Sequence, residues 1–297
     1  MITRRDLLLT AGLGAAGCLS LGGYAFAVEP MLRLLVTDYK ITPSQWPADL
    51  NLKIAVLADI HAINPWMSAA RIAAIARATN ALEPDIVLLA GDYEAGMRGF
   101  GIGSSVSMMD CARALSLLEA PLGVHAVLGN HDVSTNGGNN VRRAFAAFGI
   151  PVMENAALRL EKDGRPFWLL GLADQVGNGG RYASAGGFDD LPGTLAQIRD
   201  DAPAILLAHE PDIFVDVPGR IALTIAGHTH GGQVRIPGFG ALHVPSRFGR
   251  RFAYGHIVEQ DRHLVVSAGL GTSGLPVRFG VPPEIVTIRL GGVTGVA

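Results

Sequence analysis

Five of the nine histidines in this 297-residue chain lie in short polar motifs, beside carboxylate, amide or glycine residues. Asp59 and His61 are two residues apart, so both point to the same side of an extended chain, and His228 and His230 have the same spacing. Carboxylate, amide and imidazole groups that face one point are suitable ligands for a divalent metal ion. The motifs, in chain order, are Asp59-Ile60-His61, Gly91-Asp92, Gly129-Asn130-His131-Asp132, Ala208-His209-Glu210 and Gly227-His228-Thr229-His230.

Each motif directly follows an apolar run that is typical of a buried strand. Such runs cover residues 52–58, 86–90, 124–128, 168–172, 204–208, 221–226, 264–268 and 285–290. Helical periodicity covers residues 68–82, 108–118 and 140–148. This order predicts an α/β protein, a two-sheet β sandwich flanked by helix layers, with the polar motifs at the ends of the strands.

Several of the motifs have a purely structural interpretation when they are taken singly. Gly-Asp is a common turn dipeptide, Asn130 is a suitable helix N-cap, and His209 alone is typical of a half-buried core histidine. The cluster Gly227-His228-Thr229-His230-Gly231-Gly232 has no such explanation, because packing does not require two imidazoles among glycines. The set as a whole therefore favours a functional site over turns and caps.

The order of these motifs resembles the calcineurin-like metallophosphoesterase family, with matching residues from Asp59 to His230. Residues 231–238, 245–246, 269–271, 276–278 and 283–284 are similar to a narrower branch of exported or membrane-attached bacterial phosphodiesterases. The resemblance implies a four-layer α/β/β/α fold with metals above the strand ends. It also implies hydrolysis of phosphodiester or pyrophosphate bonds through a metal-bridged hydroxide.

The resemblance also implies a role for each motif residue. One metal would be held by Asp59, His61 and His230, the other by Asn130, His209 and His228, and Asp92 would bridge both. The mixed oxygen and imidazole set suits two ions of Mn, Fe or Zn better than Ca. His131 is the expected catalytic residue, which protonates the leaving oxygen or stabilises charge, with Asp132 orienting its ring.

The first 27 residues have the pattern of a Tat-type signal peptide or of a membrane anchor. Arg4 and Arg5 precede an apolar run from Leu7, and Ala25-Phe26-Ala27 is a small-x-small cleavage pattern. Either interpretation predicts an exported, periplasmic or cell-envelope protein, and the first makes the Tat export machinery a partner. We expect a connecting segment over residues 28–48, the metallophosphoesterase domain over 49–291 and a tail over 292–297.

The composition excludes several other classes of protein. Lys and Arg number 24 against 26 Asp and Glu, whereas a nucleic-acid coat protein normally has a strong basic excess. The chain has neither a Gly-x-x-x-x-Gly-Lys-Ser/Thr loop nor a Gly-x-Ser-x-Gly motif, which excludes a P-loop and a nucleophile elbow. Loss of residues 1–27 would remove Cys18 and leave Cys111 alone, so a mature intramolecular disulfide is not expected.

The substrate is less defined by the sequence than the reaction. Aromatic and Arg residues are interleaved over residues 236–254, a pattern that is typical either of a binding segment for a lipid tail and a phosphate or of an ordinary packed loop. Residues 99–103 are rich in glycine and predict a loop near the site. Membrane contact and a lipid-linked phosphoester such as UDP-2,3-diacylglucosamine of lipid A biosynthesis follow from the resemblance. The alternatives are a soluble cyclic-nucleotide phosphodiesterase or phosphomonoesterase, and a non-catalytic metal-binding scaffold.

Overall fold

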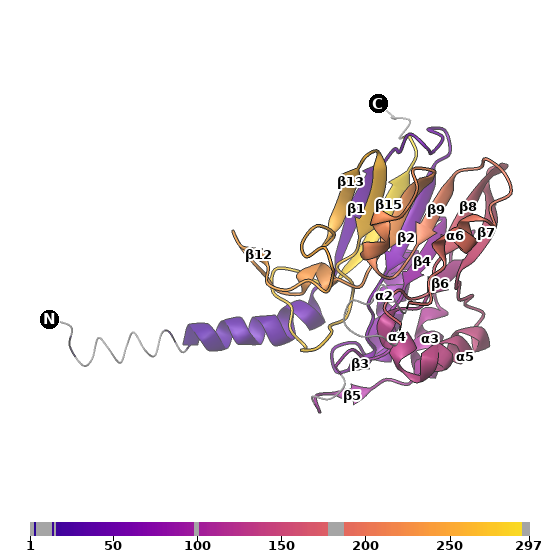
Figure 1. Ribbon diagram of the computed structural model, residues 1–297. Coiled ribbons are helices and arrows are strands. Elements are labelled where there is room, and N and C mark those ends of the chain that lie inside the picture. The colour runs from indigo at the N-terminus through magenta and orange to yellow at the C-terminus, as the bar shows by residue number, and fades with distance from the viewer. Residues whose placement is uncertain (1–2, 4–13, 15, 98–100, 178–186, 293–297) are drawn as a thin grey trace.

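Two β-sheets pack face to face in the computed structural model, which describes residues 3, 14, 16–97, 101–177 and 187–292. The first sheet has the order β1-β15-β2-β4-β6 and the second β13-β14-β10-β9-β8-β7. Helices cover the outer face of the first sheet, and the N-terminal helix extends away from the body of the molecule (Figure 1). The predicted α/β sandwich with flanking helix layers is confirmed.

Most strands that carry the polar motifs are parallel to their neighbours. In the first sheet β2, β4 and β6 run parallel, and in the second β8, β9, β10 and β14 do. The first sheet consists of β1 (Leu35–Ile41), β15 (Glu284–Leu290), β2 (Leu52–Leu57), β4 (Ile86–Ala90) and β6 (Val124–Val127). The second consists of β13 (Gly255–Glu259), β14 (Arg262–Val266), β10 (Ile221–Ala226), β9 (Ala204–Leu207), β8 (Arg165–Gly171) and β7 (Ala156–Lys162). The carboxyl ends of parallel strands therefore meet at one edge of the sandwich.

The space between the sheets is filled by aliphatic side chains from both. Val56 and Leu88 of the first sheet share a fully buried cluster with Leu207 and Ile225 of the second. A second cluster lies between the first sheet and its helices, which are α2 (Ala69–Asn80), α3 (Met108–Leu115) and α5 (Asn139–Ala147). Because β4 is buried on both faces, it reads as a continuous apolar run in the sequence, and β2 does so apart from the half-buried Lys53.

The helices start and pack where the sequence predicts them to. Ser68 caps α2 by accepting a hydrogen bond from the backbone N–H of Arg71, and Ser107 caps α3 in the same way. The buried positions of α2 are Ile72, Ile75, Ala76 and Thr79, which form one stripe along the helix. That stripe packs on the first sheet and fixes the strand ends from which the motifs extend.

Shorter elements connect the strands. They are β3 (Ile63–Asn64), β5 (Ser104–Ser105), β11 (Arg235–Ile236), β12 (Gly240–Ala241), α4 (Asn130–Ser134), α6 (Leu191–Leu195) and the 3-10 turns η2 (Asn136–Gly138), η3 (Pro211–Val215) and η4 (His230–Gly232). β11 and β12 form an antiparallel hairpin, and β3 pairs with β5. The glycine-rich segment predicted over residues 99–103 falls partly outside the described residues, which resume at Gly101 just before β5.

The N-terminal region differs from the expected connecting segment. Residues 16–23 are α-helical and continue into a π-helical stretch, η1 (Tyr24–Leu32), while the Arg4-Arg5 pair lies outside the described residues. β1, within the expected connector, pairs in parallel with β15 and is an edge strand of the first sheet. Within the described ranges, no helix is both long and apolar enough to cross a membrane.

Candidate metal centre

The polar motifs of both sheets meet at the carboxyl ends of the strands. Asp59 follows β2 and Asp92 follows β4, while His209 and His228 come from β9 and β10 of the facing sheet. With Asn130 and His131 after β6, these side chains line or lie beside a cavity of about 520 Å³. Residues more than 150 positions apart in the chain are thus brought to one place by the packing of the two sheets.

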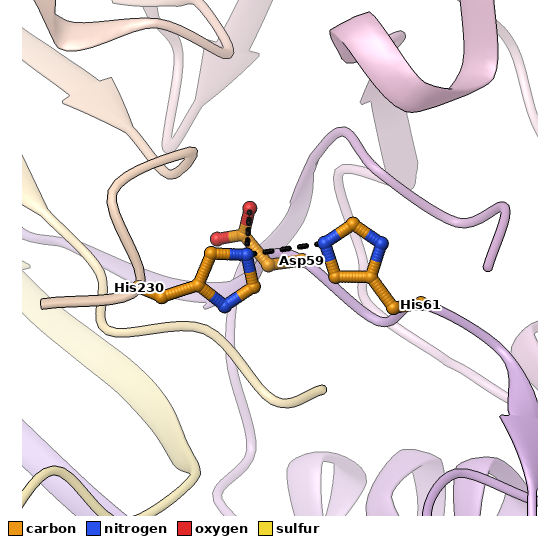
Figure 2. A group of neighbouring side chains, drawn as sticks. All are labelled: Asp59, His61 and His230. Atoms are coloured by element: carbon orange, nitrogen blue, oxygen red, sulfur yellow. Dashed lines mark hydrogen bonds and ion pairs between the residues drawn. The ribbon is translucent and has the colours of Figure 1, made fainter. Parts of the chain in front are cut away.

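A first group contains Asp59, His61 and His230 (Figure 2). His61 Nε2 lies 3.1 Å from His230 Nε2, and His230 Nε2 lies 3.7 Å from Asp59 Oδ1. The Nδ1–H of His61 donates a hydrogen bond to the carbonyl oxygen of Glu94 at 2.9 Å, which leaves the lone pair of Nε2 facing the group. Three ligand atoms therefore face one point, in the arrangement that a metal ion requires.

A second group contains Asp92, His209 and His228. His209 donates its Nδ1–H to the carbonyl oxygen of Ala90 at 2.6 Å, so that its Nε2 is again free to act as a ligand. Oδ2 of Asp92 lies 3.2 Å from His209 Nε2 and 3.5 Å from His61 Nε2. Asp92 is therefore placed between the two groups.

The backbone at this site is held in an unusual conformation. Asp59, His61, Asp92, His228 and His230 all have a positive φ, between 46° and 70°. Non-glycine residues adopt this region at a cost of about 1 kcal/mol or more each, and such residues gather at functional sites. The surrounding fold must impose these five conformations, which is consistent with selection for ligand placement rather than for stability.

Burial changes the protonation of the site. It raises the pKa of Asp59 to about 7 and lowers that of His61 to about 4 and that of His228 to about 3. Burial acts to raise the pKa of Asp92 too, but His209 and His131 outweigh it and hold that pKa well below its usual range. The imidazoles of His61 and His228 are therefore neutral near pH 7, as metal ligands must be.

The donor set fits divalent metal ions. Oδ1 of Asn130 is buried and has no hydrogen-bond partner in the described part of the chain. An unpartnered buried amide oxygen is unfavourable unless something absent from the protein satisfies it. Oxygen and imidazole donors without any thiolate are appropriate for Mn, Fe or Zn.

His131 lies beside the first ligand group, but the residues that contact its ring are not the ones that the sequence predicted. Its ring packs edge-on against His61, with centroids 4.9 Å apart, and Nε2 lies 3.2 Å from Oγ of Ser273. The expectation that Asp132 orients this ring is not met. Both carboxylate oxygens of Asp132 instead accept hydrogen bonds from backbone N–H groups, those of Asp92, Tyr93, Glu94 and Gly129. Asp132 thus holds the loops after β4 and β6 together, because a buried carboxylate is stabilised by the N–H groups that the fold places around it.

Three further residues at the site were not assigned a role from the sequence. The backbone N–H of Ser273 donates to Gln233 Oε1 at 2.8 Å, which fixes the serine near His131. Arg278 is fully buried and places Nη2 3.4 Å from His230 Nδ1. Gln233 and Arg278 fall within the runs over residues 231–238 and 276–278 that resemble a branch of the family, but that resemblance implied no role for either, and Ser273 lies outside those runs.

Comparisons with known proteins bear on this geometry. Residues 52–232 match the model of a family described as calcineurin-like phosphoesterase. The uncharacterized metallophosphoesterase YkuE of Bacillus subtilis (strain 168) is 30% identical over 98% of this chain and 98% of its own length. Phosphodiesterase YaeI of Escherichia coli (strain K12) is 30% identical over 70% of this chain and 71% of its own. The UDP-2,3-diacylglucosamine pyrophosphatase LpxG of Chlamydia muridarum (strain MoPn / Nigg) is 26% identical over 90% and 92%.

Proposed function

The chain belongs to the calcineurin-like phosphoesterase family and is a metal-dependent hydrolase of phosphoric esters, and we propose that it cleaves phosphodiester or pyrophosphate bonds at two divalent ions. The observation that carries the proposal is the pair of ligand groups at the strand ends, with Asp92 between them. A family member that had become a scaffold would not need to keep both groups complete.

We assign one ion to Asp59, His61 and His230, in agreement with the first group. The second ion falls to His209, His228 and Asn130, whose amide oxygen lacks another partner among the described residues, and Asp92 is the shared ligand. When bound, the ions supply Lewis-acid polarisation of the phosphoryl group and an activated water.

His131 is the residue that we expect to contact the leaving group of the substrate. It lines the cavity, and its backbone N–H donates to Asp92 Oδ1 at 2.9 Å, so the shared ligand fixes its position. An imidazole at this point can donate a proton to the leaving oxygen, which matters most for alkoxide leaving groups of high basicity. Ser273 holds Nε2 of the ring in place.

A lipid-linked substrate is the finer proposal, and the hairpin of β11 and β12 supports it. Gln233 and His243 flank this hairpin and line the cavity. Phe239, in the turn between the two strands, is 74% exposed, and Leu242, which follows β12 and precedes the cavity-lining His243, is 61% exposed. Apolar side chains at the rim of a catalytic cavity suit contact with an acyl chain or a bilayer surface. The relative that is named as a UDP-2,3-diacylglucosamine pyrophosphatase is consistent with this assignment.

We also propose that the protein acts in the cell envelope and keeps its N-terminal segment as an anchor. The carbonyl oxygen of Ala25 accepts a hydrogen bond from the backbone N–H of Arg278, and that of Phe26 accepts one from Trp66 Nε1, both at 2.9 Å. Glu29 is fully buried and accepts a hydrogen bond from the N–H of Val281. Cleavage after Ala27 would remove the first two contacts, which favours retention over cleavage. The intact mass of the envelope-bound protein tests this directly, and a chain that begins at Val28 would contradict it.

The proposed activity is tested with purified protein loaded with Mn²⁺. We expect two ions per chain and hydrolysis of bis(4-nitrophenyl) phosphate or of a lipid pyrophosphate, with loss of both metal and turnover in Asp92→Asn. The exposed carboxylate Asp163, in the turn between β7 and β8, provides the matched control Asp163→Asn, which should retain both. Metal binding without hydrolysis of diesters, pyrophosphates, cyclic nucleotides or monoesters would instead favour the scaffold.

A further inference from the structure

A second cavity, of about 130 Å³, opens beside the metal centre. It shares Val176, His228 and Pro245 with the main cavity, so the two are adjacent. We call it the acidic side pocket, and it is defined by Gln175, Asp189, Glu210, Asp212, Asp216 and Arg247. Its position, next to a metal ligand but outside the ligand groups, makes it a candidate subsite for one end of the substrate.

Glu210 has a buried carboxyl oxygen for which the described residues provide no hydrogen-bond donor. Its side chain is only 3% exposed and lines the pocket. Oε2 accepts a hydrogen bond from the backbone N–H of Gln175 at 3.1 Å, but Oε1 has no hydrogen-bond partner within the described ranges. Oε1 of the Gln175 side chain is unpartnered in the same sense. Burial and the carboxyl group of Asp174, which interacts with the Glu210 side chain, raise the pKa of Glu210 well above its usual range. A ligand that brings hydrogen-bond donors and positive charge would satisfy the two unpartnered oxygens.

The charge of the pocket indicates that this ligand is a cation. Arg247 is the single Lys or Arg that lines it among the described residues, and its Nε lies 3.6 Å from Asp212 Oδ2. Ser246 and the backbone N–H of Arg247 also donate to Asp212, whose charge is therefore compensated. Asp189, Glu210 and Asp216 have no Lys or Arg within ion-pair distance in the part of the chain that the structure describes.

The same carboxylates do not form a cage for a metal ion. The groups of Asp, Glu, His or Cys whose ligand atoms approach within 4.8 Å include none of Asp189, Asp212 and Asp216, as far as the described residues go. Burial, together with Asp174 and Asp216, raises the pKa of Asp189, as expected where uncompensated carboxylates face one another. Carboxylates that are spread around a cavity suit a larger cation with several N–H donors better than they suit a compact ion.

We propose that the acidic side pocket binds a primary ammonium group on the substrate, so that the enzyme prefers phosphoesters of small amino alcohols. The inference rests on the proposed function, because the metal centre must hold the phosphoryl group while the side pocket takes the amine. A cavity of about 130 Å³ lies well below the roughly 300–1,000 Å³ of pockets for drug-sized ligands, and therefore fits an aminoalkyl chain rather than a nucleoside.

Binding measurements test the pocket without any need for turnover. Calorimetry on the Mn²⁺-loaded full chain compares 2-aminoethyl phosphate with propyl phosphate, in which a methyl group replaces the ammonium. Because hydrogen bonds between an ammonium group and carboxylates are charge-assisted and among the stronger ones, we expect binding of the amine to be tighter by about tenfold. Asp189→Asn and Asp216→Asn should each bring the ratio towards one, and Asp163→Asn, on an exposed turn, should leave it unchanged.

Turnover separates this inference from the proposed function. We expect 4-nitrophenyl 2-aminoethyl phosphate to have a higher kcat/KM than 4-nitrophenyl propyl phosphate, which has the same leaving group. If both diesters are hydrolysed at equal kcat/KM and the two phosphate ligands bind equally, the ammonium-binding role of the side pocket is wrong, while the proposed phosphodiesterase activity stands. Selective binding without hydrolysis would overturn the catalytic proposal and support the pocket. A third Mn²⁺ that is lost in Asp216→Asn would show a metal subsite instead and overturn the inference.

Discussion

Replacing Gly129 by alanine adds one methyl group directly against two residues of the second ligand group, Asp92 and His209. The backbone of Gly129 has φ −106° and ψ 175°, which alanine adopts without strain, so the only change is the volume of the side chain. The new Cβ would lie 2.3 Å from Oδ1 of Asp92 and 2.7 Å from Nε2 of His209. Ordinary contact begins at 3.4 Å, so the shared ligand must move by about 1 Å.

A shift of Asp92 by about 1 Å is expected to lower both the stability of the protein and its turnover rate. Overpacking a buried site costs about 1–3 kcal/mol of stability, and a 1 Å misplacement of a reacting group lowers the rate by about 100-fold. We therefore expect Gly129→Ala to fold, to lose at least one of two Mn²⁺ ions per chain by mass-spectrometric metal analysis, and to hydrolyse bis(4-nitrophenyl) phosphate about 100 times more slowly. Gly219→Ala is the matched control, because nothing lies within 4 Å of its added Cβ. Full metal content and full turnover in Gly129→Ala would refute the placement of Asp92 between two ions.

Three further predictions concern protonation and reactivity. His131→Ala should keep both ions yet lose most turnover of alkyl diesters and less of nitrophenyl diesters, because the latter leave without a proton; equal losses would contradict the acid role. Burial raises the pKa of Asp59 to about 7 in the metal-free chain, so below that pH an incoming ion must displace a proton. Carboxylates led by Asp92 outweigh burial and hold the pKa of His209 well above its usual range, so that ligand must lose a proton as well. Mn²⁺ affinity by calorimetry should accordingly rise by about tenfold per unit or more from pH 6 to 7 and continue to rise above pH 7, whereas a flat profile would exclude this coupling. Cys111 is buried, and burial raises the pKa of its thiol. A disulfide reagent at pH 8 should therefore modify only the exposed Cys18 until the protein is unfolded. Two reactive thiols in the native protein would contradict the burial of Cys111.

Much of the architecture follows from local sequence. The apolar runs over residues 86–90 and 221–226 coincide with β4 and β10, because strands that are buried on both faces read as uninterrupted hydrophobic segments. The edge strands β1, β7 and β13 were not predicted. Their side chains are mostly exposed or half-buried, so no continuous apolar run marks them.

The candidate ligands could be proposed from the sequence because metal coordination restricts residue type, and parallel strands bring their carboxyl ends together. The hydrogen-bond partners of each candidate side chain come from backbone segments that are far away in the sequence, so the sequence could not predict them. Asp132 follows His131 directly, yet its carboxylate is satisfied by N–H groups from the loop after β4, which only the pairing of β4 with β6 brings near. Glu210 likewise follows a ligand in the chain, but the two sheets had to pack before its oxygen could be left without a donor beside Asp189 and Asp216, within the described residues. Residue type and strand order thus determined the reaction, whereas long-range packing, which sets burial and charge, decided what surrounds the reacting groups.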